Sequence, residues 1–175
     1  ILSDDSSTEA EKMEVLKAEA AFNSQLEELN LTTLQGKRHT SDGRVIDVAD
    51  RDWFHVVKAG KDFFSEPLIS RIDNNKLITV AAVPIYDSNR NLSAILAANI
   101  SGTWFSDNIK DITVGQTGSA LIVNNEGVTL AHKNFGVVRA MLNTIKEGKT
   151  DARYASLAKF LQHAVSSNSD VGYYD

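Results

Sequence analysis

The segment LITVAAVPIYDSNRNLSAILAANI, residues 77–100, decides the fold of this chain. Two apolar runs, Leu77–Tyr86 and Leu92–Ile100, flank the polar stretch Asp87–Asn91. Apolar runs on both sides of a short polar turn are typical of an antiparallel hairpin in a buried sheet. Pro84 has no backbone N–H and lies near the end of the first run, which favours a sheet edge or a bulge there.

The residues before this hairpin predict further strands and one short helix. Leu31–Leu34 is a candidate strand, and Gly36 or Asp42-Gly43 is a candidate turn. Asp50–Lys58 predicts a short helix that its first residue caps and that Gly60 ends.

Residues 1–30 predict an N-terminal helix that follows a polar, frayed start. Thr8 and Glu11 have the spacing of a capping box. Apolar residues recur at helical steps of three and four, namely Val15, Ala18, Phe22, Leu26 and Leu29. This stripe either packs on a sheet of the same chain or meets a second copy of the chain in a homodimer, and the sequence leaves both open.

Residues 115–175 predict the start of a second module. Its expected elements are the turn Gly115–Gly118, strands Ser119–Asn124 and Val128–His132, and helices Val137–Lys146 and Tyr154–Val165, the last capped by Thr150 or Asp151. The chain begins with Ile1 and ends after the strand-like Val171–Tyr174, so we expect a longer protein in which this module continues.

These elements predict an α+β fold with antiparallel sheets. The expected parts are an N-terminal helix over residues 1–30, a first module over 31–101, a linker over 102–114 and an incomplete second module over 115–175.

Composition excludes several classes of function. The 175 residues carry 18 Lys and Arg against 23 Asp and Glu, a net charge of −5, which argues against general nucleic-acid binding. There is no cysteine, so disulfides, Fe–S clusters, thiolate zinc sites and cysteine nucleophiles are excluded. No apolar stretch approaches the roughly 18 residues that suggest a membrane span.

Motifs of common catalytic and metal sites are missing. The four histidines, His39, His55, His132 and His163, show no metal-ligand spacing. The sequence contains neither a P-loop nor a GxSxG elbow. We therefore predict no catalytic residue, no metal and no cofactor.

The densest chemical cluster is Asp50-Arg51-Asp52-Trp53-Phe54. A guanidinium can hold a carboxylate through two hydrogen bonds, and an adjacent Trp offers an apolar wall. The residue types alone also fit an arginine that pairs with Asp50 or Asp47 beside a core aromatic residue.

An ordered series of motifs resembles the double Cache (dCache) family. It consists of Asp50–Phe54, Ser65-Glu66-Pro67, Ala82–Asp87 and Ile95–Ile100, followed by Val114–Gly127 with Ala131-His132. Members of this family are extracytoplasmic sensor domains of bacterial chemoreceptors, histidine kinases and diguanylate cyclases. The resemblance implies a long helix beside two PAS-like modules, with transmembrane helices and a cytoplasmic output domain outside this segment.

The resemblance also implies a ligand site in the first module. In the amino-acid-binding subset, residues matching Arg51, Trp53 and Phe54 contact the ligand carboxylate, and an Asp at the position of Asn99 holds the ammonium. Here that position is neutral, Phe54 replaces a Tyr, and Ile46 and Leu68 stand where the subset has Tyr. We therefore expect a carboxylate without the amine, or another small polar metabolite, rather than an α-amino acid.

The full set of expected ligand-binding residues is Arg51, Trp53, Phe54, Ser65, Arg71, Asp73 and Asn99, with Arg71 and Asp73 at the rim of the site. The alternative is a structural or dimerisation module whose site no longer binds a ligand. A site filled by the chain's own side chains would favour that alternative.

Overall fold

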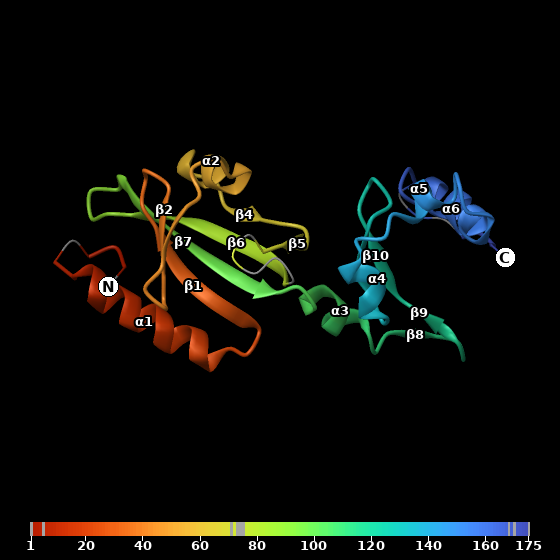
Figure 1. Ribbon diagram of the computed structural model, residues 1–175, viewed down its shortest axis with the longest axis horizontal. Coiled ribbons are helices and arrows are strands. Elements are labelled where there is room, and N and C mark those ends of the chain that lie inside the picture. The colour runs from red at the N-terminus through yellow and green to blue at the C-terminus, as the bar shows by residue number, and fades with distance from the viewer. Residues whose placement is uncertain are drawn as a thin grey trace. The chain divides into compact units, whose positions relative to one another are not determined.

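The computed structural model describes residues 2–4, 6–70, 72, 76–167, 169 and 171–174. The chain divides into two compact units, Ile1–Gly102 and Thr103–Asp175. The first unit is an antiparallel sheet with a helix on each face, as Figure 1 shows. Its elements are α1 (Glu9–Phe22), β1 (Leu26–Thr32), β2 (Lys37–Thr40), β3 (Val45–Asp47), α2 (Asp52–Lys58), β4 (Phe63–Phe64), β5 (Leu68–Ile69), β6 (Leu77–Tyr86) and β7 (Leu92–Ser101). The α+β fold with antiparallel sheets is confirmed.

The predicted hairpin over residues 77–100 forms the middle of this sheet. The strand order is β3-β2-β1-β7-β6-β4, and β5 also pairs with β6. Strands β6 and β7 pair from Ile78 opposite Ser101 to Tyr86 opposite Leu92, with an irregularity between Ile85 and Tyr86. Pro84 lies just before that irregularity, as its missing N–H predicts.

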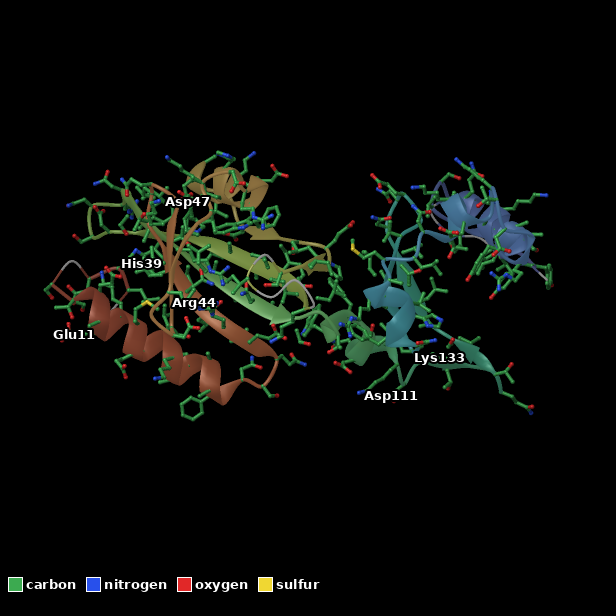
Figure 2. The ribbon with its side chains drawn as sticks, viewed as in Figure 1. Glu11, His39, Arg44, Asp47, Asp111 and Lys133 are labelled. Carbon is green, nitrogen blue, oxygen red and sulfur yellow. The ribbon has the colours of Figure 1, made fainter. Side chains whose placement is uncertain are left out.

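The capping box at the start of α1 is confirmed. The Oγ1 of Thr8 accepts a hydrogen bond from the backbone N–H of Glu11 at 3.3 Å. The Glu11 carboxylate, labelled in Figure 2, accepts from the backbone N–H of Thr8 at 2.7 Å. Two N–H groups that would lack partners at the helix start are thereby satisfied.

The predicted extension of this helix to residue 30 is wrong. Helix α1 ends at Phe22, and β1 begins at Leu26. Pairing of β1 with β7 supplies backbone hydrogen bonds to this segment, and this tertiary pairing prevails over the helical spacing. The predicted apolar stripe is therefore not one helix face: Phe22 is 89% exposed, and Leu16 is the residue of α1 that is buried.

Helix α2 places the aromatic cluster against the sheet. It begins at Asp52 with Arg51 in the N-cap position, so the predicted cap Asp50 is wrong. The cause is the extended backbone of Arg51, whose carbonyl accepts the first helical hydrogen bonds. Gly60, at φ +82°, ends the helix as expected. The core that α2 covers comprises Val48, Trp53, Phe54, Val57, Ile78, Val80, Ala82, Ile95 and Ala97.

The second unit contains two short hairpins and four helices in the part that the structure describes. Its elements are α3 (Trp104–Ile109), β8 (Thr113–Val114), β9 (Gly118–Ser119), β10 (Leu121–Val123), β11 (Thr129–His132), α4 (Phe135–Arg139), α5 (Thr144–Glu147) and α6 (Ala152–Ala164). The hairpin predicted over 119–132 is confirmed as β10 paired with β11. The expected linker over 102–114 contains α3, which packs against these two strands.

Two predictions for the second unit are wrong. The helix expected over Val137–Lys146 is two helices, α4 and α5, because the backbone of Met141 turns left-handed at φ 48°. The strand-like Val171–Tyr174 is not a strand, and its Tyr173 side chain is 97% exposed, so no sheet face stabilises it.

Asp151 caps α6, accepting a hydrogen bond from the Arg153 N–H at 2.9 Å. Within the described ranges, no helix has both the length and the apolar character of a membrane span.

Candidate functional site

One face of the first sheet carries a row of polar side chains. Side chains alternate between the two faces of a strand, and residues paired across strands share a face. The row comprises Glu28, Asn30 and Thr32 of β1, Arg38 and Thr40 of β2, and Asn99 of β7. The opposite face meets α1, where His39, labelled in Figure 2, pairs with Glu9 of the helix.

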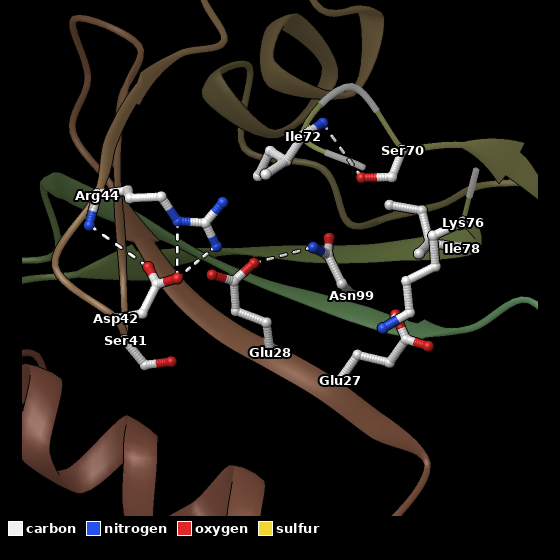
Figure 3. Close-up of a pocket in the computed structure, with 10 residues that line it drawn as sticks. All are labelled: Glu27, Glu28, Ser41, Asp42, Arg44, Ser70, Ile72, Lys76, Ile78 and Asn99. Carbon is white, nitrogen blue, oxygen red and sulfur yellow. Dashed lines mark hydrogen bonds and ion pairs between the residues drawn. The ribbon is translucent and has the colours of Figure 1, made fainter. Parts of the chain in front are cut away.

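A cavity of about 540 Å³ opens at this polar face. It is lined by Glu27, Glu28, Ser41, Asp42, Arg44, Ser70, Ile72, Lys76, Ile78 and Asn99. Figure 3 shows the Asp42–Arg44 pair at one end, Glu27 and Lys76 at the other, and Glu28 with Asn99 between them. The volume lies in the range of small-molecule sites.

Glu28 is the centre of a buried polar network. Its Oε2 accepts a hydrogen bond from Asn99 Nδ2 at 3.0 Å and forms an ion pair with Arg38 Nη2. The side chains of Arg38 and Glu28 are only 9% and 12% exposed. Burial lowers the pKa of Arg38, and the negative charge of Glu28 opposes this shift. The Oδ1 of Asn99 is buried and has no hydrogen-bond partner within the part of the chain that the structure describes.

The other acidic side chains of the cavity are also paired. Arg44 donates from Nε to Asp42 at 2.7 Å, and this bond, with a second from Thr40, holds the pKa of Asp42 well below its usual range. The carboxylate of Glu27 lies 3.1 Å from Lys76 Nζ. Each carboxylate in the described lining therefore has a cation of the chain beside it.

A second cavity of about 40 Å³ lies beside α2. Arg38, Arg51, Trp53 and Ser70 line it, together with the apolar side chains Ile46, Val48, Leu68, Ile72, Ile78 and Val80. Its described lining contains two guanidinium groups and no carboxylate. Ser70, Ile72 and Ile78 line both cavities, so the two cavities adjoin at these three side chains.

The structure brings some of the expected ligand-binding residues to these cavities and not others. Arg51 and Trp53 line the small cavity, and Asn99 lines the large one. Phe54 is 3% exposed in the core, and Ser65 accepts a hydrogen bond from the Val80 N–H at 2.8 Å; neither belongs to the described lining of these two cavities. Arg71 and Asp73 lie outside the described residues.

Sequence reasoning missed Glu28 and Arg38. It placed Glu28 in a helix, although Glu28, Asn30 and Thr32 alternate with Leu29 and Leu31 in the period of a strand. That alternation was the available signal for β1. Arg38 had no comparable signal, because its place in the site follows from the pairing of β2 with β1.

The helices, the antiparallel sheet and the two adjoining cavities on its polar face define a PAS-like ligand-binding module. The model of the Cache domain family dCache_1 matches residues 3–170, so the chain belongs to this family of sensor domains. Comparison with curated protein sequences gave no match.

Solved structures show the same fold at low sequence identity. The ligand-binding domain of the Pseudomonas aeruginosa PAO1 amino acid chemoreceptor PctC in complex with GABA has a TM-score of 0.65 and 16% identity, over 86% of this chain and 68% of that chain. The extracellular domain of mmHK1S-Z3, described as a histidine kinase, has a TM-score of 0.65 and 14% identity, over 93% and 68%. The ligand-binding domain of Mlp24 with asparagine has a TM-score of 0.59 and 18% identity, over 96% and 63%.

Proposed function

We propose that this chain is the extracytoplasmic sensor domain of a bacterial transmembrane receptor and that its first unit binds a small metabolite bearing a carboxylate. The small cavity carries this proposal, because its described lining has two guanidinium groups and no acidic side chain. A guanidinium binds a carboxylate through paired, charge-assisted hydrogen bonds. Arg51 clamps the carboxylate, and Trp53 forms the adjacent wall.

The rest of the ligand occupies the large cavity, which adjoins the small one at Ser70, Ile72 and Ile78. There Asn99 Oδ1 accepts a hydrogen bond from a hydroxyl or N–H of the ligand. The acidic side chains of this cavity are already paired with Arg38, Arg44 and Lys76, so an ammonium would have to compete with these cations. This arrangement supports an acid without an α-amine.

The fold relatives are consistent with a carboxylate as the shared recognition element. GABA, bound by PctC, and asparagine, bound by Mlp24, both carry one. The two ligands differ in the position of the amine. The carboxylate is therefore the common feature that the small cavity binds. The opposite end of the ligand lies in the large cavity.

Signalling follows from differential affinity. A ligand changes the balance between two arrangements of a protein only if it binds one of them more tightly. Strand β1 contributes Glu27 and Glu28 to the large cavity and directly follows α1, so a ligand that shifts β1 also shifts the helix. The helix or the second unit then passes the change toward a cytoplasmic output domain.

Titration with acids and with their matching amides tests whether the site requires a carboxylate. Butanoate, 4-hydroxybutanoate and 4-aminobutanoate are each compared with the corresponding primary amide by calorimetry and by thermal unfolding. A ligand at 100 times its dissociation constant stabilises the fold by about 2.7 kcal/mol. We expect at least one acid to bind tenfold more tightly than its amide, and Arg51→Gln to abolish this preference while Arg90→Gln, in the exposed β6–β7 turn, retains it. Equal affinity for acids and amides would contradict the proposal.

The structural alternative predicts a site filled by the chain's own side chains. The Arg51 cavity measures only about 40 Å³, but the adjoining cavity of about 540 Å³ has room for a ligand body and supports ligand binding instead. An absence of binding across acids, amides, amines and nucleobases would restore the alternative.

A further inference from the structure

Arg38 lies at the boundary between the two cavities. It pairs with Thr32 of β1 across the β1–β2 ladder, and its side chain is 9% exposed. Arg38 lines the small cavity together with Arg51, whereas its ion-pair partner Glu28 lines the large cavity. The Glu28–Arg38 pair therefore connects the two spaces that one ligand would fill.

The guanidinium of Arg38 is only partly used by the chain. Its Nη2 pairs with Glu28, whereas its Nε is buried and has no hydrogen-bond partner among the described residues. Buried N–H groups are nearly always satisfied, and a donor left without an acceptor in a low-dielectric site is destabilising. Arg38 lines the small cavity, so an acceptor that enters there and moves its side chain slightly would satisfy this buried donor.

Glu28 also fixes the direction of this donor. A guanidinium is planar, so a bond at Nη2 sets the plane in which the Nε–H lies. Asn99 holds the Glu28 carboxylate in turn, through the hydrogen bond from Nδ2 at 3.0 Å. The network from β7 through β1 to β2 thus orients Arg38 before any ligand arrives, which lowers the entropic cost of binding.

We propose that Arg38 is a second arginine that binds the ligand carboxylate, using its Nε, and that Glu28 is the positioning residue for its guanidinium. This inference rests on the proposed binding of a carboxylate at Arg51. It adds a specificity-determining residue on a different strand and explains why the small cavity is lined by two cations. The carboxylate lies between β2 and the start of α2, and the ligand body extends toward Glu28 and Asn99.

Acetate is the probe, and acetamide is its neutral counterpart of the same shape. Trp53 lines the small cavity, so its fluorescence reports occupancy in a Trp104→Phe background, at constant ionic strength. The variant is Arg38→Lys, which keeps the positive charge opposite Glu28 and removes Nε. Arg90→Lys, an exposed arginine of the same unit, is the matched control.

We expect acetate to bind the parent protein at least tenfold more tightly than acetamide, and Arg38→Lys to weaken acetate binding tenfold or more without the same loss for acetamide. Arg90→Lys should leave both affinities unchanged. If acetate has no advantage over acetamide in the parent, the proposed function fails. If Arg51→Lys weakens acetate binding and Arg38→Lys does not, only the role of Arg38 is overturned.

A second variant keeps the inference testable if Arg38→Lys does not fold. Glu28→Gln retains an oxygen acceptor for Nη2 and removes the negative charge that competes for the guanidinium. Acetate binding should tighten in Glu28→Gln, because Arg38 then offers its full charge to the ligand. An unchanged or weaker affinity for acetate in this variant would count against Arg38 as a ligand-binding residue.

Discussion

Glu28 of β1 and Arg38 of β2 form a buried ion pair whose two members line different cavities. Breaking such a pair leaves a buried charge without compensation, which typically costs about 3–5 kcal/mol. We expect Glu28→Ala to lower the free energy of unfolding by an amount of this order. The double variant Glu28→Leu/Arg38→Met should lose less than Glu28→Ala alone, as chemical denaturation can measure. A larger loss in the double variant would show that the charges stabilise the fold beyond their mutual compensation.

Asn99 is a neutral side chain beside the Glu28 carboxylate in the large cavity. Its Nδ2 donates to Glu28 Oε2 at 3.0 Å, so Asn99→Asp places two carboxylates side by side. We expect this variant to bind butanoate more weakly and 4-aminobutanoate more strongly than the parent, with a change of about tenfold, or roughly 1.4 kcal/mol, in their affinity ratio. Calorimetry measures both affinities. Asn89→Asp, in the exposed β6–β7 turn, is the control, and an unchanged ratio in Asn99→Asp would remove Asn99 from the site.

Ser65 has a structural role in this fold. Its Oγ accepts a hydrogen bond from the Val80 N–H at 2.8 Å, and the side chain is buried. Ser65→Ala leaves that N–H without an acceptor, so the free energy of unfolding should fall by about 1–3 kcal/mol. The affinity for acids should stay unchanged, since Ser65 lines neither cavity. A loss of affinity at unchanged stability would assign Ser65 to the ligand instead.

Both the backbone conformation and the space at position 36 favour glycine. The φ of Gly36 is +81°, and an added Cβ would lie 2.5 Å from the Cβ of Ala49. Gly43 has a similar φ of +85° and open space around it. Left-handed backbone alone costs a non-glycine residue roughly 1–2 kcal/mol, so we expect Gly43→Ala to lose about that much and Gly36→Ala clearly more. Thermal unfolding of the two variants separates backbone strain from steric conflict; equal losses would contradict the conflict with Ala49.

Protonation of Asp42 at low pH should lower the free energy of unfolding. Hydrogen bonds from Arg44 and Thr40 hold the pKa of Asp42 below the ordinary 3.8 of an Asp. A carboxyl whose pKa is lower in the folded state stabilises the fold above its unfolded pKa, and this contribution is lost as the pH falls through its folded pKa. The contribution of Asp42 to the free energy of unfolding should therefore be level above a pH of about 5 and decline below it. Asp42→Asn should make the decline shallower, and an identical pH profile would contradict this role.

Several elements of this fold are specified by residues close together in the chain. The hairpin over residues 77–100, the capping box at Thr8 and the turn at Gly60 were predictable, because each depends on residues close together in the chain. The helix predicted over residues 1–30 was not correct, since Leu26 and Leu29 fit a helical period and a strand position equally well. Pairing with β7 decided between the two.

The sequence by itself determined the α+β class and the Cache family motifs, and it singled out Arg51 and Trp53, which line the small cavity. Only the tertiary structure decided that Glu28, Arg38 and Asn99 form one network, because they lie on three strands whose register no local pattern specifies. Binding sites of this kind combine side chains from distant segments. Burial and pairing decide which of their charges are compensated within the chain. They also decide which hydrogen-bond donors and acceptors remain for a ligand.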